Sequence, residues 1–206
     1  GKIDEFSPNS KKVHIDIDPS SINKNVKVDL PIVGDVQDVI SSTIKTIKKT
    51  KPDFAKSNKQ KISKWWEQIE KWRKKRSLDF INSNETIKPQ YAVQRLYELT
   101  KNKDTYITTE VGQHQMWAAQ HYKFNKPNRW MTSGGLGTMG YGLPAAVGVQ
   151  IAHPKKLVID IAGEASVLMT MQEMSTAVQY KLPIKIFILN NEYMGMVRQW
   201  QELLHE

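Results

Sequence analysis

The sequence predicts an α/β protein with a mostly parallel sheet covered by helices on both faces. Two apolar runs, residues 156–162 and 184–189, have the length and the β-branched content of buried strands. The segment between them, residues 168–180, has the pattern of a helix. A strand, helix, strand unit of this kind places its two strands parallel in one sheet.

Earlier segments repeat the alternation of strands and helices. We expect strands at residues 12–18 and 28–33, followed by a helix that Asp35 caps and whose apolar positions have helical spacing: Val36, Val39, Ile40, Thr43, Ile44 and Ile47. Further along, we expect a helix around residues 91–99, a short strand at residues 105–108, a helix over residues 113–122 and an apolar helix through Val147 and Ile151.

The composition changes in the middle of the chain and indicates a connector. Residues 48–85 are rich in lysine, serine and asparagine around one helical stretch, so we place the end of a first α/β domain at residues 1–47 and a second domain at residues 86–206. Trp65, Trp66, Ile69 and Trp72 form one apolar stripe of the connector helix. The lysines beside them then form a solvated helix face, and we do not expect a nucleic-acid partner despite the net charge of +9.

Three further features bound the class of protein. No apolar run reaches the length of a membrane span, the first residues lack the pattern of a signal peptide, and the sequence contains no cysteine. We therefore expect a cytoplasmic protein without a membrane partner, a disulfide framework or a thiolate metal site.

Polar side chains follow both of the apolar strands. Gly163-Glu164-Ala165 comes directly after the first strand, and Asn190-Asn191 follows the second. Because adjacent parallel strands end at the same edge of a sheet, Glu164 and Asn191 should converge there. Oxygen ligands at this edge suit Mg²⁺ holding a phosphate group.

The glycine-rich stretch at residues 134–142 is a second candidate site. Residues 135–140 satisfy the G-x-G-x-x-G pattern of dinucleotide binding, and Asp160 lies where that pattern expects a ribose-binding acid. However, the preceding strand, residues 129–132, is short and poorly apolar. A nicotinamide or flavin site, purely structural turns and a site for another phosphorylated cofactor all remain open on the residues alone.

The spacing of these motifs resembles a known family. Gly163-Glu164-Ala165, followed at the expected interval by Asn190-Asn191, is similar to the thiamine diphosphate signature. Together with residues 111–117, 133–146 and 192–200, it resembles the large catalytic subunit of acetolactate synthase (acetohydroxyacid synthase). Residues 1–45 resemble the end of the central FAD-binding domain of that family.

The resemblance implies an activity, cofactors and partners. The parent enzyme uses thiamine diphosphate and Mg²⁺, with FAD in the full-length protein, to decarboxylate pyruvate and join the two-carbon unit to a second 2-keto acid such as pyruvate or 2-ketobutyrate. This reaction begins branched-chain amino acid synthesis. The resemblance also implies a homodimer or homotetramer and a regulatory small subunit.

The resemblance further assigns roles to individual residues. It implies that Mg²⁺ is held by Glu164, Asn191 and the backbone carbonyl of Tyr193. It implies catalytic positions at Gln113, His114 and Met139 and a substrate channel at Met196 and Trp200. The residues it places against thiamine diphosphate are Gln113, His114, Gly137, Thr138, Met139, Glu164, Ala165, Ser166, Asn191, Tyr193, Met194, Gly195 and Met196, and those near the flavin are Asp16, Ile17, Asp35 and Val36.

Two departures from the family pattern shape our expectations. The family has Asp where this chain has Glu164, so we expect weakened or rearranged metal binding. The activating glutamate of the family belongs to the N-terminal domain of the other subunit, and we therefore expect the isolated chain to be inactive. The alternatives are another thiamine diphosphate enzyme, such as pyruvate oxidase or glyoxylate carboligase, and a non-catalytic remnant that serves as a binding or oligomerisation module.

Overall fold

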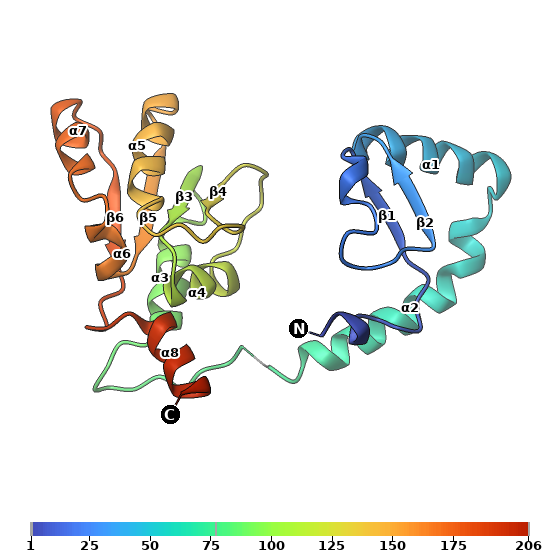
Figure 1. Cartoon of the computed structure of the whole chain (residues 1–206), viewed down its shortest axis with the longest axis horizontal. Helices are drawn as coiled ribbons and strands as arrows, with labels where there is room; N and C mark the ends of the chain where they lie inside the picture. Colours follow the sequence, from blue (N-terminus) through green and yellow to red (C-terminus); the bar gives the residue numbers. More distant parts are fainter. Residues whose placement is uncertain (1, 77, 206) are drawn as a thin grey trace. The chain divides into compact units, whose positions relative to one another are not determined.

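The computed structural model describes residues 2–76 and 78–205 and contains two compact units, Gly1–Ser77 and Leu78–Glu206 (Figure 1). The division falls inside the lysine-rich segment that we expected to connect two domains. Each unit is described by itself below.

The first unit contains a small parallel sheet. Strand β1 (Val13–Asp16) pairs with β2 (Leu30–Val33), with Val13 opposite Leu30. Two short 3-10 helices, η1 (Ile3–Glu5) and η2 (Pro19–Ser21), flank β1. Helix α1 (Val36–Thr50) follows β2, and the Asp35 carboxylate accepts hydrogen bonds from the backbone N–H groups of Gln37 at 2.8 Å and Asp38 at 3.3 Å. The predicted helix cap is therefore confirmed.

Helix α2 (Phe54–Arg73) carries the predicted tryptophan stripe. The rings of Trp65 and Trp72 lie 5.5 Å apart in an edge-to-face arrangement, and the guanidinium of Arg73 lies over the ring of Trp66. The tryptophans are nonetheless about half exposed, with 58% of the Trp65 surface accessible. The expected amphipathic helix is present, and its aromatic side chains pack mainly on one another.

The second unit is built on a four-stranded sheet with the order β4-β3-β5-β6, in which every pair of neighbouring strands is parallel (Figure 1). The strands are β3 (Thr105–Thr109), β4 (Trp130–Thr132), β5 (Leu157–Ala162) and β6 (Lys185–Ile188). The helices are α3 (Pro89–Thr100), α4 (Gln113–His121), α5 (Gly142–Ala152), α6 (Glu164–Leu168), α7 (Glu173–Gln179) and α8 (Gly195–Leu204). The predicted fold class is confirmed.

Helices cover both faces of this sheet, and the strand residues alternate between them. On one face, Val93 of α3 and Ala118 of α4 pack against Ile107, Ile159 and Ile161. On the other face, Ala146 of α5 packs against Tyr106 and Val158, and Leu143 packs against Ala162. Because successive strand residues point to opposite faces, the even-numbered side chains of β3 and β5 lie under α5.

Two details of this unit differ from the prediction. The single helix expected over residues 168–180 is wrong, since α6 ends at Leu168 and α7 begins only at Glu173. The interruption has a tertiary cause: the Thr170 hydroxyl donates to the Gly140 carbonyl at 3.0 Å, which holds the intervening turn against the glycine-rich loop. Helix α8 was not predicted as an element.

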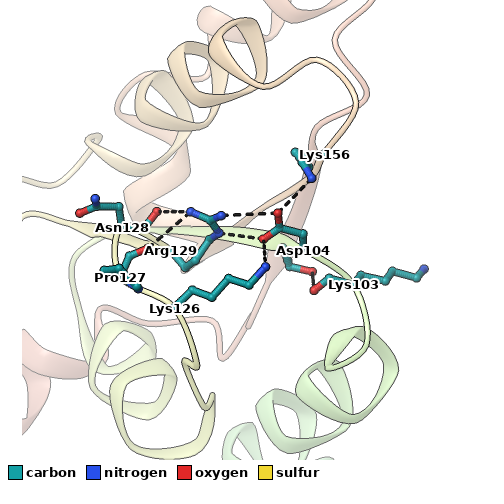
Figure 2. A network of polar contacts seen from close by, with 8 residues as sticks. Lys103, Asp104, Lys126, Pro127, Asn128, Arg129 and Lys156 are labelled. Atoms are coloured by element: carbon teal, nitrogen blue, oxygen red, sulfur yellow. Dashed lines mark hydrogen bonds and ion pairs between the residues drawn. The ribbon is translucent and has the colours of Figure 1, made fainter.

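The amino ends of the strands in this sheet are linked by a charged cluster around Asp104, which directly precedes β3 (Figure 2). Its carboxylate lies 2.9 Å from Nε of Arg129, 3.0 Å from Nζ of Lys156 and 3.5 Å from Nζ of Lys126. Hydrogen bonds from Arg129 and Lys156 hold the pKa of Asp104 below its usual range. Because Arg129 and Lys156 precede β4 and β5, the cluster ties together the starting ends of three neighbouring strands.

Candidate functional site

A cleft lies at the carboxyl ends of β3, β5 and β6, where ligands bind to open parallel sheets. It is lined by residues from four segments: the end of β3 with the start of α4, the start of α6, Met139 of the glycine-rich loop, and the segment between β6 and α8. The cavity is about 50 Å³, which is room for a few water-sized groups. The predicted site residues that line it are Gln113, His114, Met139, Glu164, Ala165, Ser166, Asn191, Tyr193, Met194, Gly195 and Met196.

Three oxygen-bearing groups converge at one end of this cleft. One atom of the Asn191 side-chain amide lies 3.2 Å from Oε1 of Glu164 and 2.7 Å from the carbonyl oxygen of Tyr193. If that atom is the amide nitrogen, it donates to both oxygens; if it is the amide oxygen, the three oxygens form a cluster. Neighbouring ligands of an octahedral Mg²⁺ at about 2.1 Å are separated by about 3.0 Å, so the observed spacing suits a cation.

The turn after β6 shapes this cluster. The side chain of Asn190 accepts a hydrogen bond from the backbone N–H of Glu192 at 3.0 Å, and Glu192 has φ +65°, in the left-handed region that non-glycine residues seldom occupy. In the orientation that points the Asn191 amide oxygen toward Glu164, this oxygen also accepts a weak hydrogen bond from the Tyr193 N–H at 3.4 Å. This strained turn brings the Tyr193 carbonyl beside Asn191.

His114 forms the floor of the cleft between two glycines. A Cβ atom added to Gly112 or Gly163 would lie within 3.0 Å of the His114 ring, so both positions require glycine. The ring is 7% exposed, and its Nε2 atom has no hydrogen-bond partner in the described part of the chain. Burial lowers the pKa of His114 to about 4, although the backbone of Glu110 and the charge of Glu164 act in the opposite direction. His114 is therefore neutral near pH 7.

Gln113 joins the cleft to helix α8. Its Nε2 group donates to Oε1 of Gln199 at 3.0 Å, and its side chain packs so tightly on Gly195 that any larger residue there would collide with the amide. Gln199 was not predicted to be a neighbour of the site. Six further residues that line the cleft were not assigned a site role: Val111, Gly112, Trp117, Gly163, Leu189 and Val197. All of them except Leu189 lie inside the motif segments 111–117, 163–165 and 192–200, which is the signal that could have assigned them.

The glycine-rich loop reaches the cleft through Met139. Gly137 and Gly140 have φ +68° and +85°, which favour glycine, and the backbone N–H of Thr138 donates to Oγ of Ser133 at 3.0 Å. Gly137 and Thr138 are exposed and lie outside the cavity lining. A ligand whose tail enters the cavity would therefore extend its remainder past Met139 and over this loop.

Beneath the loop, two buried carboxyl groups lie on the α5 face of the sheet. Glu110 and Asp160 are both fully buried. The Asp160 Oδ1 atom accepts a hydrogen bond from the Thr108 hydroxyl at 3.0 Å, while Oδ2 has no partner within residues 2–76 and 78–205. Burial raises the pKa of Asp160 to about 7, and the charge of Glu110 adds to this effect.

The interior position of Asp160 contradicts the dinucleotide interpretation of the loop. A ribose-binding acid must reach solvent at the strand end, whereas Asp160 lies inside β5 under Gly142. A Cβ atom at Gly142 would collide with the Asp160 carboxylate and would lie 2.6 Å from the Glu110 backbone nitrogen. Gly142 therefore serves the close packing of α5 on the sheet.

Apart from Ser166, the remaining predicted positions do not line the cleft. Ser166 lines it, but its hydroxyl donates to the Val111 carbonyl at 2.8 Å. Trp200 lies on α8, is 56% exposed and does not line the cavity. In the first unit, Asp16 and Asp35 accept local hydrogen bonds from the backbone, and Ile17 and Val36 are exposed; no flavin contact follows from their geometry.

These residues fit a small cation and an attached anionic group better than a site built from several charged ligands. Among the described residues, no group of three or more His, Cys, Asp or Glu side chains comes together. The oxygen cluster supplies one carboxylate, one carboxamide and one carbonyl, so a divalent cation held there keeps positive charge for further oxygen ligands. His114 also lines this cleft, and its buried Nε2 atom has no hydrogen-bond partner among the described residues.

Comparisons with known proteins agree with this geometry. Residues 110–206 match the C-terminal TPP binding domain of thiamine pyrophosphate enzymes, and residues 1–43 match their central domain. The chain is 47% identical over 201 residues to the acetolactate synthase isozyme 3 large subunit of Escherichia coli K12, covering 98% of this chain and 34% of that protein.

Two acetolactate synthase large subunits give similar values. That of Buchnera aphidicola subsp. Schizaphis graminum is 49% identical, over 98% of this chain and 34% of its own length. That of Porphyra purpurea is 46% identical, over 100% of this chain and 34% of its own length. The chain thus spans about a third of the length of these relatives. It belongs to the thiamine pyrophosphate enzyme family, and its relatives over nearly its whole length are acetolactate synthase large subunits.

Proposed function

We propose that this chain forms the thiamine diphosphate- and Mg²⁺-binding part of an acetolactate synthase large subunit. The observation that carries the proposal is the meeting of Glu164, Asn191 and the Tyr193 carbonyl at the carboxyl ends of β5 and β6. These groups come from the two ends of the thiamine diphosphate signature, which lies within the matched range 110–206.

In this proposal, Oε1 of Glu164, Oδ1 of Asn191 and the Tyr193 carbonyl would hold Mg²⁺, which would offset the negative charge of the cofactor diphosphate. The amide orientation that would serve the cation is the one with the Asn191 oxygen toward the other two oxygens. The backbone around Ala165 and Ser166, together with Gln113 and His114, borders the space for the phosphate groups. Met139, Gly137 and Thr138 would border the rings of the cofactor.

When bound, thiamine diphosphate supplies the site that accepts the electron pair released by decarboxylation of a 2-keto acid. The residues of this chain would bind and orient it, and neutral His114 would present a ring with one N–H group and one unprotonated nitrogen beside the diphosphate. The overall reaction takes pyruvate and a second 2-keto acid and releases carbon dioxide. Met196, which lines the cleft, and Trp200 are the proposed contacts of the second keto acid.

The partners and the remaining cofactor are parts of the same proposal. We infer that the chain works within a dimeric or tetrameric enzyme with a regulatory small subunit, since its relatives are named large subunits. FAD binding through Asp16, Ile17, Asp35 and Val36 and a cytoplasmic location rest on the sequence alone. Within the described residues, no helix is long and apolar enough to cross a membrane.

The alternative enzymes are not favoured, because the reported relatives are acetolactate synthase large subunits. The deciding experiment measures the melting temperature of the chain with thiamine diphosphate and Mg²⁺ together and with each alone. Binding at 100 times the dissociation constant stabilises the fold by about 2.7 kcal/mol, so the two ligands together should raise the melting temperature by several degrees. No shift with both ligands would favour the non-catalytic remnant.

A further inference from the structure

Glu110 makes more hydrogen bonds than a residue at the end of β3 needs in order to continue the sheet. It is fully buried, and its backbone N–H continues the sheet by donating to the Ile161 carbonyl at 3.0 Å. Its carboxylate accepts hydrogen bonds from the backbone N–H groups of Gly140 at 2.7 Å and Leu143 at 3.0 Å. Glu110 therefore connects a strand end to a loop that lies 30 residues further along the chain.

This carboxylate replaces the cap that α5 lacks. Tyr141, the residue at the N-cap position, makes no capping hydrogen bond with its side chain. Burial raises the pKa of Glu110, whereas hydrogen bonds from the backbone of Leu143, Gly140, Gly142 and Tyr141 lower it. A serine or aspartate at the N-cap would satisfy such N–H groups locally and without burying a carboxyl group. A cap supplied from β3 has the additional effect of fixing the loop relative to the sheet.

The loop is fixed at Gly140 from two sides. Its N–H donates to Glu110, and its carbonyl accepts from the Thr170 hydroxyl at 3.0 Å. Its φ of +85° and the contact that a Cβ atom would make with Thr170 at 2.9 Å leave no room for another residue. Met139 is the preceding residue, and its side chain lines the cleft. The position of Met139 is therefore set by the anchors of Gly140.

We propose that Glu110 is a positioning residue, which holds Met139 in the cofactor cleft by anchoring the backbone of Gly140 and Leu143. The expected effect of Glu110 on cofactor affinity rests on the proposed function, since the position of Met139 affects affinity only if a cofactor binds beside it. Glu110 itself is not among the residues that line the cleft. Its next neighbour, Val111, lines the cleft and accepts the Ser166 hydrogen bond, so the same strand end also holds α6.

The test replaces Glu110 with glutamine, which keeps the volume but turns an amide N–H₂ group toward one of the two backbone donors. In Glu110→Gln, hydrogen exchange at the amides of Gly140 and Leu143 should accelerate at least tenfold, and the affinity for thiamine diphosphate with Mg²⁺ should fall at least tenfold. The matched control is Val93→Ala, which opens a cavity in the opposite helix layer and lowers the melting temperature without touching the loop. In Val93→Ala, the hydrogen exchange of the Gly140 and Leu143 amides, measured relative to that of the β5 amides, should match the native chain. Its affinity for thiamine diphosphate should also match that of the native chain.

The readouts separate this inference from the proposed function. Loop exchange is measured without cofactor, so a native chain that fails to bind thiamine diphosphate overturns the proposed function and leaves the anchoring test intact. Native exchange at Gly140 and Leu143 in Glu110→Gln, or an equal loss of affinity in Val93→Ala, would overturn the positioning role. If Glu110→Gln does not fold, Thr170→Val decides: loss of the second Gly140 anchor should lower cofactor affinity threefold or more, and unchanged affinity would overturn the inference.

Discussion

Replacing Glu164 with aspartate tests the proposed role of this carboxylate as a ligand of Mg²⁺. The Glu164 side chain already reaches the oxygen cluster, with Oε1 3.2 Å from the Asn191 amide. Reach is therefore not what limits binding. The cost lies in the additional rotatable bond, which must be fixed when the cation binds and which costs about 0.5–1 kcal/mol. We expect Glu164→Asp to bind Mg²⁺ in the presence of thiamine diphosphate about two to five times more tightly than the native chain.

The assay titrates Mg²⁺ at a fixed, saturating concentration of thiamine diphosphate and follows tryptophan fluorescence, because Trp117 lines the cleft. Glu164→Gln is the matched control, because it keeps the length of the side chain but removes its charge. Losing an interaction of a charged group costs about 1.5–3 kcal/mol, so Glu164→Gln should bind Mg²⁺ at least about tenfold more weakly. Affinity of Glu164→Asp equal to that of the native chain, or tenfold weaker, would refute the argument, since the shorter side chain would then fail to reach the cluster.

Three further perturbations test the surroundings of the site. Burial raises the pKa of Asp160 from 3.8 to about 7, so its folded form holds a proton that the unfolded chain releases, and its contribution to stability is lost as the pH rises from about 4 to 7. The free energy of unfolding of Asp160→Asn, measured in urea at several pH values, should therefore rise relative to that of the native chain between pH 4 and 7. The rise should be at most about 1.4 kcal/mol per pH unit, and a difference that does not change with pH would contradict the raised pKa of Asp160. Glu192→Gly should raise stability by about 1 kcal/mol, because glycine accepts the positive φ of the turn, and a lower urea midpoint would show that the Glu192 side chain contributes more than the strain costs. Asp104→Asn should lower the melting temperature by a few degrees by releasing Arg129 and Lys156, and the difference should shrink in high salt; a salt-independent loss would point to the hydrogen bonds rather than the charges.

The sheet of the second unit could be predicted because its strands carry their own signal. Residues 157–162 combine an apolar run with β-branched side chains, and the predicted strand differs from β5 by one residue. The helix break at residues 169–172 could not be predicted, because its cause is the contact between Thr170 and Gly140, which lie far apart in the sequence. Local pattern alone favours a continuous helix there, and the tertiary hydrogen bond overrides it.

The candidate site shows the same division. Glu164 and Asn191 could be placed together because both follow parallel strands of one unit, and the structure brings them within 3.2 Å. The neighbours contributed by α8, above all Gln199, were not predicted, because the sequence does not show how a helix beyond the last strand packs on the cleft. The number of residues between the glycine motif and Asp160 suggested a ribose-binding acid. The position of Asp160 inside β5 instead buries its side chain in the protein.

Glu110 and Glu164 carry the same sequence signal, an acidic residue two positions after the end of a predicted strand, yet they occupy opposite environments. Glu164 follows Gly163, so its side chain begins α6 and faces the cleft, where it meets Asn191. Glu110 continues β3 without a glycine, and the alternation of the strand turns its side chain under α5, where the backbone N–H groups of Gly140 and Leu143 surround it. A single glycine between strand and acid therefore separates the proposed cation ligand, Glu164, from the proposed loop anchor, Glu110. The chemistry of each carboxylate follows from the face of the sheet to which the chain delivers it.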